Sequence, residues 1–242
     1  MQSRSLRRRS RELLLATFLL ALPAPPLPAI AGDGEANIRP GVNEKYLAPD
    51  LDIDHWKEIF EGESREIFRS RREIVGALGL EPGMRVADIG AGTGLFLEPL
   101  AKAVGPEGRV YAVDISPVFV EHLKRRAARA GLSQVAVVQS RERSAGLPEA
   151  SVDLIFLCDV YHHFEYPRST MASLERALRP GGWLVVIDFE RIPGESRDWI
   201  LDHVRAGKRE VTAEIAAAGF LLEDEVKVEG LRENYLLRLR KP

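Results

Sequence analysis

Cysteine is almost absent from this sequence: Cys158 is the single one among 242 residues. No intrachain disulfide can form, so the core must hold the fold together in either an oxidising or a reducing compartment. Cys158 follows an apolar run at residues 154–157, and this context predicts a buried small side chain rather than a reactive thiol. A disulfide-stabilised scaffold is therefore excluded.

An excess of one charge is also absent, because 34 basic residues stand against 36 acidic ones and the formal net charge is −2. Such a balance creates no global field that would favour nucleic acid or an anionic membrane, so we predict no nucleic-acid partner. The 242 residues, of which 45% are hydrophobic, suffice for one well-packed domain and are few for two. No internal repeat is evident, and nothing in the sequence indicates an oligomeric state.

The N-terminal apolar run at residues 13–22 has about half the length that a transmembrane helix needs. Prolines at positions 23, 25, 26 and 28 prevent its extension as a helix. Five arginines precede the run, and Ala29, Ile30 and Ala31 follow the prolines, which is the order of a secretory signal peptide. We expect residues 1–31 to be a signal peptide, the protein to be periplasmic or secreted, and no stable membrane span to remain after cleavage.

Three alternatives stay open for this leader. The pair Arg8 and Arg9 is typical of the twin-arginine export route, although Arg11 and Glu12 stand where that route prefers apolar residues. The segment is otherwise a disordered basic tail, or a leader that is retained in the cytoplasm or kept as an anchor.

Residues 32–53 are rich in Gly, Pro, Asn and Asp and lack apolar periodicity, so we predict an extended arm that packs late or stays mobile. Asp54 is suited to cap a helix that runs to Leu78 with a break near Gly62. Residues 54–242 form the expected main domain.

From residue 85 the chain alternates short strands with helices, which is typical of a parallel sheet covered on both faces. The last two strands are joined by so few residues that they must pair as an antiparallel hairpin. The expected fold class is α/β: a Rossmann-like, doubly wound, mostly parallel seven-stranded sheet with a C-terminal antiparallel hairpin. The predicted strands are 85–89, 109–113, 135–139, 152–157, 183–189, 221–228 and 234–239, and the predicted helices are 95–104, 117–130, 168–178 and one of about ten residues that ends near 217.

A glycine-rich turn lies between the first strand and the next helix, with the sequence Asp88-Ile-Gly-Ala-Gly-Thr-Gly94. Glycines let the backbone turn tightly and approach a ligand at a helix N-terminus. About twenty residues later Asp114 ends the second strand, where a carboxylate can hold a ribose. A nicotinamide dinucleotide is the competing ligand, but the glycine spacing differs from Gly-x-Gly-x-x-Gly and no tyrosine has a lysine four residues later.

With the runs at 147–155, 159–164 and 178–184, these elements resemble the ordered motifs of the class I S-adenosylmethionine-dependent methyltransferases that act on small molecules, the type 11/25 group. The resemblance covers residues 84–189 and implies S-adenosylmethionine as cofactor and a small-molecule acceptor. It implies that the glycine turn lines the methionine part, Asp88 orients its amino group, Asp114 holds the ribose, and Ile115 and Glu142 lie near the adenine. The implied cofactor-binding residues are Asp88, Gly90, Ala91, Gly92, Gly94, Asp114, Ile115 and Glu142.

Asp159, Tyr161, His162 and His163 follow the fourth strand at the edge where such sheets bind ligands, so they are the candidates for acceptor contact and catalysis. Side chains that are adjacent on an extended segment point opposite ways, so we expect only one histidine to face the cleft. The resemblance favours a packing role for His163, and a general base and a structural role both stay open.

Two further hypotheses concern charged side chains. Asp159, His162 and His163, joined by His55 or His203, are conceivable metal ligands, but without a firm third ligand we predict no metal. Arg71 falls within the apolar stripe of the 54–78 helix, whereas Arg65, Arg69 and Arg72 project away. We hypothesise that Arg71 points into the mouth of the site; the alternative is a side chain that snorkels past the apolar edge.

A conflict remains between leader and cofactor, because S-adenosylmethionine is made in the cytoplasm. The second class of function is therefore an exported, non-catalytic module that binds an adenosyl ligand.

Overall fold

The computed structural model describes residues 34–242, so the predicted leader lies outside the described residues. One seven-stranded sheet has the order β3-β2-β1-β4-β5-β7-β6. The first five strands are parallel, and β7 pairs antiparallel with both β5 and β6. The strands are β1 (Arg85–Ile89), β2 (Arg109–Asp114), β3 (Val135–Gln139), β4 (Val152–Cys158), β5 (Leu178–Phe189), β6 (Leu221–Glu225) and β7 (Asn234–Arg240).

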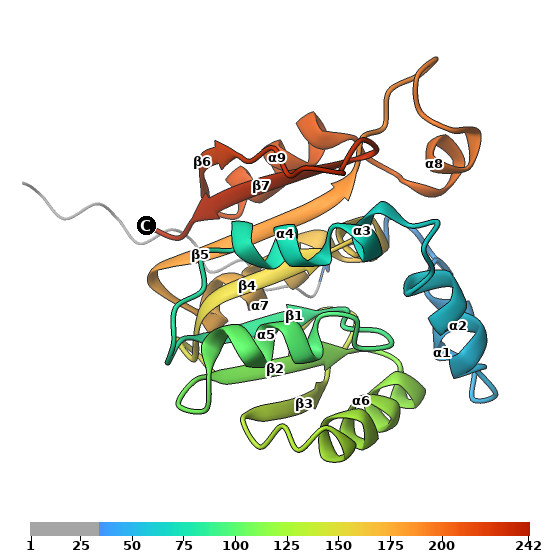
Figure 1. The fold of residues 1–242 in the computed structure, drawn as a ribbon. Coiled ribbons are helices and arrows are strands. Elements are labelled where there is room, and N and C mark those ends of the chain that lie inside the picture. The colour runs from blue at the N-terminus through green and yellow to red at the C-terminus, as the bar shows by residue number, and fades with distance from the viewer. Residues whose placement is uncertain (1–33) are drawn as a thin grey trace, which may run out of the picture. The chain divides into compact units, whose positions relative to one another are not determined.

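Helices cover both faces of this sheet (Figure 1). One face packs against helices α4, α5 and α6, and the other face against α7 and α9. The residues of β1 alternate between these layers: Val86 joins the first core and Ala87 the second, as expected for a strand that is buried on both sides. The helices are α1 (Glu44–Leu47), α2 (Ile53–Phe60), α3 (Glu66–Arg69), α4 (Arg71–Ala77), α5 (Leu97–Val104), α6 (Pro117–Arg129), α7 (Pro167–Ala177), α8 (Asp198–His203) and α9 (Lys208–Ala217).

The predicted fold class is confirmed, down to the reversed hairpin that closes the sheet. Within residues 34–242, no helix combines the length and the apolar character that crossing a bilayer requires.

The predicted break near Gly62 is confirmed, but the 54–78 segment is divided once more, so that three short helices occupy it. Asp52 rather than Asp54 caps the first of them, since its Oδ1 accepts the backbone N–H of Asp54 at 3.0 Å and of His55 at 3.2 Å. At Gly62 a Cβ would lie 2.5 Å from the carbonyl oxygen of Glu58, so the chain makes a turn there that only glycine fits. This turn separates α2 from α3.

The described part of the arm, residues 34–53, makes specific contacts with the sheet domain. The carboxylate of Glu35 accepts the backbone N–H groups of Arg168 and Ser169, both at 2.8 Å, and so satisfies the N-terminus of α7. The backbone N–H of Ile38 donates to the carbonyl of Glu165 at 3.0 Å. The arm then forms α1 and delivers its side chains to the edge of the sheet.

Candidate active site

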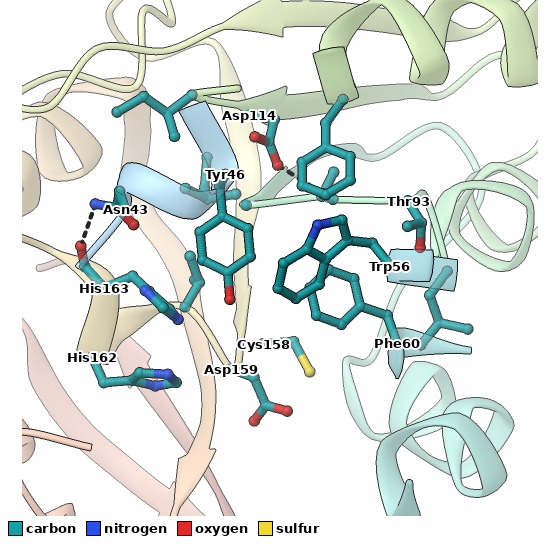
Figure 2. A pocket seen from close by; sticks show the side chains of 18 of the residues that line it. Asn43, Tyr46, Trp56, Phe60, Thr93, Asp114, Cys158, Asp159, His162 and His163 are labelled. Atoms are coloured by element: carbon teal, nitrogen blue, oxygen red, sulfur yellow. Dashed lines mark hydrogen bonds between the residues drawn. The ribbon is translucent and has the colours of Figure 1, made fainter. Parts of the chain in front are cut away.

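A cavity of about 750 Å³ opens at the carboxyl ends of the parallel strands (Figure 2). Its walls come from the arm, from α2, from the loops after β1, β2, β3 and β4, and from α8 and the start of β7. This is the edge at which doubly wound sheets bind ligands, because the loops diverge there on either side of the sheet.

The glycine turn after β1 forms one wall of the cavity. Gly90 has a φ of 72°, and a Cβ at this position would lie 2.4 Å from Cγ2 of Val160. The backbone N–H groups of Gly90 and Ala91 donate to the carbonyl of Val113 at 2.8 and 3.0 Å, so the turn is held against the end of β2. The close approach of the glycine turn to Val160 therefore depends on the absence of a side chain at residue 90.

Asp88 and Asp114 place two buried carboxyl groups beside this turn. Asp114 Oδ2 accepts the N–H of Gly92 and Oδ1 accepts the N–H of Ser116, both at 2.8 Å. Burial raises the pKa of Asp114 to about 6, against the opposing hydrogen bonds. Burial, assisted by the negative charge of Asp114, raises the pKa of Asp88 to about 7. Both groups line the cavity, so a ligand with donors or positive charge would stabilise their ionised forms.

The remaining implied cofactor residues divide into two groups. Ala91, Ile115 and Glu142 line the cavity with Asp88, Gly90, Gly92 and Asp114. Gly94 does not line it: a Cβ there would lie 3.0 Å from Leu123 and 3.3 Å from Arg126, both on α6. The expected place of Gly94 in the ligand wall is thus corrected, since this glycine lets α6 pack closely behind the turn.

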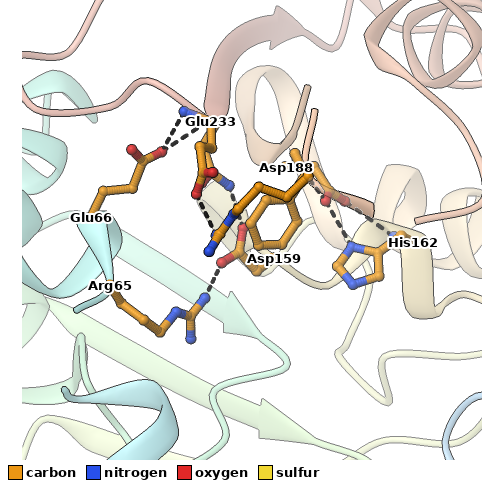
Figure 3. Close-up of polar contacts among 9 residues, drawn as sticks. Arg65, Glu66, Asp159, His162, Asp188 and Glu233 are labelled. Carbon is orange, nitrogen blue, oxygen red and sulfur yellow. Dashed lines mark hydrogen bonds and ion pairs between the residues drawn. The ribbon is translucent and has the colours of Figure 1, made fainter. Parts of the chain in front are cut away.

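Asp159, which follows β4, lies at the centre of a polar network that borders the cavity (Figure 3). Its φ is 53°, an unusual backbone conformation for a residue other than glycine. Arg65 forms an ion pair with Oδ2 of Asp159, and the Asn234 side-chain amide donates to Oδ1 at 2.6 Å. Burial raises the pKa of Asp159 to about 6 although the Arg65 charge opposes the shift.

The hypothesis about Arg71 is corrected, because the structure places this side chain outside the cavity. Its guanidinium lies over the ring of Phe68, 4.2 Å from the ring centroid, and donates to the carbonyl of Phe68. Arg65, which we expected to point away, lines the cavity. Arg65 lies just before α3 in extended backbone, so the helical spacing that predicted its direction does not apply there.

Both His162 and His163 line the cavity, which corrects the expectation that only one would do so. They lie on a short 3-10 helix, Tyr161–His163, rather than on an extended segment, and their ring centroids are 4.3 Å apart. Asp188 at the end of β5 holds His162: its two oxygens contact the ring Nδ1 at 2.7 Å and the backbone N–H at 3.1 Å.

Tyr161 does not line the cavity, so its expected contact with an acceptor is corrected. The ring is fully buried in the core, and its hydroxyl donates to Glu214 of α9 at 2.8 Å. The same 3-10 turn that brings both histidines into the cavity rotates Tyr161 away from it.

His203, from the end of α8, meets the two histidines with ring centroids at 5.1 Å from each. Burial, together with the neighbouring His162, lowers the pKa of His203 to about 4. Burial likewise lowers the pKa of His163 far below its usual range. His163 and His203 are therefore neutral at pH 7.

An aromatic wall closes the cavity above the glycine turn. Tyr46 of α1 lies 4.8 Å from the Trp56 ring, and Trp56 lies 5.1 Å from the Phe60 ring, both of the latter on α2. Phe119 of α6 completes the group at 6.3 Å from Phe60. Figure 2 shows Tyr46, Trp56 and Phe60 side by side, with Tyr46 next to His163.

Sequence reasoning missed several cavity residues that come from distant segments. An acidic residue directly after the apolar run of β5 was a usable signal for Asp188, but nothing local marked the others. The missed residues are Asn43, Tyr46, Trp56, Phe60, Arg65, Phe119, Asp188 and Asn234.

Comparison with known proteins indicates a methyltransferase domain. The model of a methyltransferase domain matches residues 87–186. An uncharacterised 37.1 kDa protein in transposon Tn4556 of Streptomyces fradiae is 35% identical over 150 residues, which cover 61% of this chain and 42% of that protein. A ubiquinone/menaquinone biosynthesis C-methyltransferase of Bordetella parapertussis is 30% identical over 118 residues, 49% of this chain and 45% of that one. The chain thus spans less than half the length of these relatives.

Solved structures extend the likeness beyond the matched segment. A S-adenosylmethionine-dependent methyltransferase from Aquifex aeolicus is 26% identical with a TM-score of 0.69, and the match covers 79% of this chain and 99% of that one. The glycine turn, Asp88 and Asp114 lie within residues 87–186, the segment that the methyltransferase-domain model matches. Residues 87–186 thus match a methyltransferase domain, and the fold is similar to that of an S-adenosylmethionine-dependent methyltransferase.

Proposed function

We propose that this protein transfers a methyl group from S-adenosylmethionine to a small-molecule acceptor bound in the same cavity. The observation that carries the proposal is the hydrogen bond from the N–H of Gly92 to Asp114 Oδ2, at 2.8 Å. It joins the glycine turn and the acid of β2 into one ligand-binding surface, which is the arrangement that an adenosyl ligand requires.

The residues present fit this cofactor. Each carboxylate oxygen of Asp114 has a lone pair beyond its backbone contact, which a ribose hydroxyl can use. Oγ1 of Thr93 is buried, lines the cavity and has no hydrogen-bond partner within residues 34–242, so it offers a further polar contact. Asp88 offers a carboxylate to an amino group. S-adenosylmethionine supplies a methyl group that its sulfonium already activates.

The protein's own contribution is to position the acceptor and to exclude water. Methyl transfer from a sulfonium is an in-line displacement, so most of the acceleration comes from orientation. Arg65, Asp159 and the three histidines line the cavity and offer polar groups to an acceptor, and the aromatic wall covers the glycine turn. A cavity of about 750 Å³ that must also hold the cofactor leaves room for a compact acceptor only.

Calorimetry on the purified full chain, with S-adenosylmethionine and its demethylated product, tests the cofactor. Asp114→Asn should weaken binding about 10- to 100-fold, because a hydrogen bond to a charged group contributes roughly 1.5–3 kcal/mol. Asp224→Asn on the exposed face of β6 is the matched control and should bind as the unchanged protein does. Absence of binding at millimolar ligand would refute the proposal.

A methyl-transfer screen with small thiols, phenols, amines and metalloid oxyanions then tests catalysis. Turnover of one class identifies the acceptor. Binding of the cofactor without turnover of any class favours the alternative, a non-catalytic module that binds an adenosyl ligand.

We also propose that the protein is exported. The reason is that basic, apolar and small residues follow one another in positions 1–31 in the order of a signal peptide. Mass spectrometry of the mature protein tests this, because cleavage after Ala31 leaves Gly32 as the first residue. An intact N-terminus in the cytoplasmic fraction would contradict it.

A further inference from the structure

Three histidines from two separate segments converge in the cavity. His162 and His163 come from the turn after β4, and His203 comes from the end of α8, some forty residues later. Within the described part of the chain, this trio is the group of histidine, cysteine and acidic side chains whose ligand atoms all lie within 4.8 Å of one another. Such convergence is unusual for a core, because each imidazole brings polar nitrogens that need partners.

The hydrogen bonds around the trio leave ring nitrogens available to a further partner. Asp188 engages Nδ1 of His162 at 2.7 Å, so Nε2 is the nitrogen left for another partner. Nδ1 of His163 is buried and has no hydrogen-bond partner among residues 34–242. A carboxylate that holds one nitrogen of a histidine while the other faces a metal is the usual outer shell of a metal-binding histidine.

We propose that His162, His163 and His203 bind a divalent transition-metal ion, Zn²⁺ by preference, with Asp188 as the carboxylate that orients His162. Three imidazoles are a ligand set that zinc accepts, and the fourth position of its tetrahedron stays open. That position faces the cavity, which the three rings line.

Metal binding requires only a small decrease in the distances between the histidine nitrogens. Zinc–nitrogen bonds of about 2.0–2.1 Å place tetrahedral ligands roughly 3.4 Å from each other. The nitrogens now lie within 4.8 Å, so the largest gap closes by about 1.4 Å. His203 can supply this movement, because it is half-buried on the last residue of a six-residue helix, whereas His162 is fixed by Asp188.

The surrounding charges are compatible with a cation. Asp188 contributes a carboxylate at the site, and Asp159 lines the same cavity with both oxygens held by Arg65 and Asn234. Lys45 lies over the rings of Tyr46 and Trp56, and Arg39 donates to the carbonyl of Asp202. The two nearby cations thus make contacts of their own on the arm and on α8.

The metal site stands on the histidine geometry alone, and only its role in the reaction rests on the proposed function. In that role the open position would bind an oxygen, nitrogen or sulfur atom of the acceptor and hold it opposite the glycine turn. The acceptor would then be a small molecule with a hydroxyl, thiol or amine able to coordinate a metal.

Zn²⁺ titration of the untagged, metal-stripped full chain by calorimetry tests the site, with Co²⁺ absorption as a second probe of tetrahedral coordination. We expect one ion per chain with sub-micromolar affinity. His203→Gln should weaken Zn²⁺ binding at least about 100-fold, and Asp188→Asn about 10- to 100-fold. His55→Gln is the matched control: this exposed histidine also lines the cavity but lies outside the trio, and the variant should bind Zn²⁺ normally.

The same samples are titrated with S-adenosylmethionine, so that failure of the two proposals can be told apart. Normal cofactor binding with no uptake of Zn²⁺ overturns the metal site and leaves the methyltransferase proposal standing. Uptake that His203→Gln leaves unchanged, or that His55→Gln abolishes, overturns the assignment to these three histidines. Melting curves of each variant confirm that it is folded.

Discussion

The two walls of the cavity are built in opposite ways. The cofactor wall comes from one continuous stretch, because Asp88, the glycine turn and Asp114 belong to neighbouring parallel strands and the loop between them. We name the rest of the lining, which faces the acceptor in the proposed function, the acceptor wall. It includes Tyr46, Arg65, His162, His203 and Asn234, which come from five separate places in the chain. One wall is set by local strand geometry, and the other depends on how the arm, α8 and β7 dock onto the sheet.

This difference has a consequence for what each wall tolerates. Backbone conformation determines the shape of the cofactor wall, so a single added methyl group would disrupt it. Side-chain pairing dominates the acceptor wall, where a lost partner leaves a buried charge behind. The predictions below test the contrast, beginning with the largest expected effect.

Gly90→Ala should abolish cofactor binding, with a loss of at least about 100-fold. The added Cβ would lie 2.4 Å from Val160, at a φ of 72° that costs about 1 kcal/mol or more for any residue but glycine. Calorimetry measures the loss. Gly105→Ala is the matched control, because it has a φ of 69° with no atom within 4 Å of the new Cβ. The control should lose stability but keep binding, and equal losses in both variants would refute the steric argument.

Arg65→Met should lower the free energy of unfolding by about 2 kcal/mol at pH 8, because it leaves the buried Asp159 carboxylate without its cation. At pH 5 the loss should be smaller, since the pKa of Asp159 is about 6 and the carboxyl is then mostly neutral. Urea denaturation at the two pH values measures this difference.

Two variants accompany Arg65→Met. Arg72→Met on the exposed face of α4 should change stability by less than about 0.5 kcal/mol. The double variant Arg65→Met with Asp159→Asn should recover part of the loss at pH 8. A loss that is the same at both pH values would contradict an electrostatic cause.

Cofactor affinity should fall about tenfold between pH 8 and pH 6, because binding favours the ionised form of Asp88, whose pKa is about 7. The stability of the unliganded protein depends on pH in the opposite direction and falls as the pH rises. The pKa values of Asp88 and Asp114 lie above their ordinary 3.8, so their contribution to stability is complete below about pH 4 and is lost as pH rises through 6 and 7.

Calorimetry in two buffers with different ionisation enthalpies counts the protons that binding releases near pH 6.5. Asp88→Asn should remove most of this release. An affinity that does not change with pH would show that neither carboxylate ionises on binding.

Arg71→Met should have the smallest effect, with cofactor affinity unchanged within about twofold and a stability loss of about 1 kcal/mol or less from the lost contact with Phe68. Calorimetry and melting curves measure the two quantities. A large loss of affinity would restore the hypothesis that Arg71 reaches the ligand.

The sequence predicts the sheet and the cofactor wall well, because both follow from patterns within short windows. Strand β1 is predicted residue for residue, and the turn after it is marked by glycines whose spacing is itself the signal. Asp114 needs only the rule that parallel strands end at the same edge.

The acceptor wall resists prediction for a physical reason. The 54–78 segment forms three helices, and Arg65 precedes α3 in extended backbone, so Arg65 lines the cavity where Arg71 was expected. The 3-10 geometry of the turn after β4 brings both histidines to one side and removes Tyr161. His203 reaches them only through the docking of α8, which no local pattern encodes.

Glu66 completes a ring of contacts in the acceptor wall. Its carboxylate accepts three successive backbone N–H groups, those of Arg232, Glu233 and Asn234, at 2.8–2.9 Å. The side chain of Asn234 then holds Asp159, and Asp159 holds Arg65, the immediate neighbour of Glu66 (Figure 3). Asp159 is therefore connected both to the start of β7, through Asn234, and to the residue before α3, through Arg65. A ligand that displaces Asp159 would displace these two segments together.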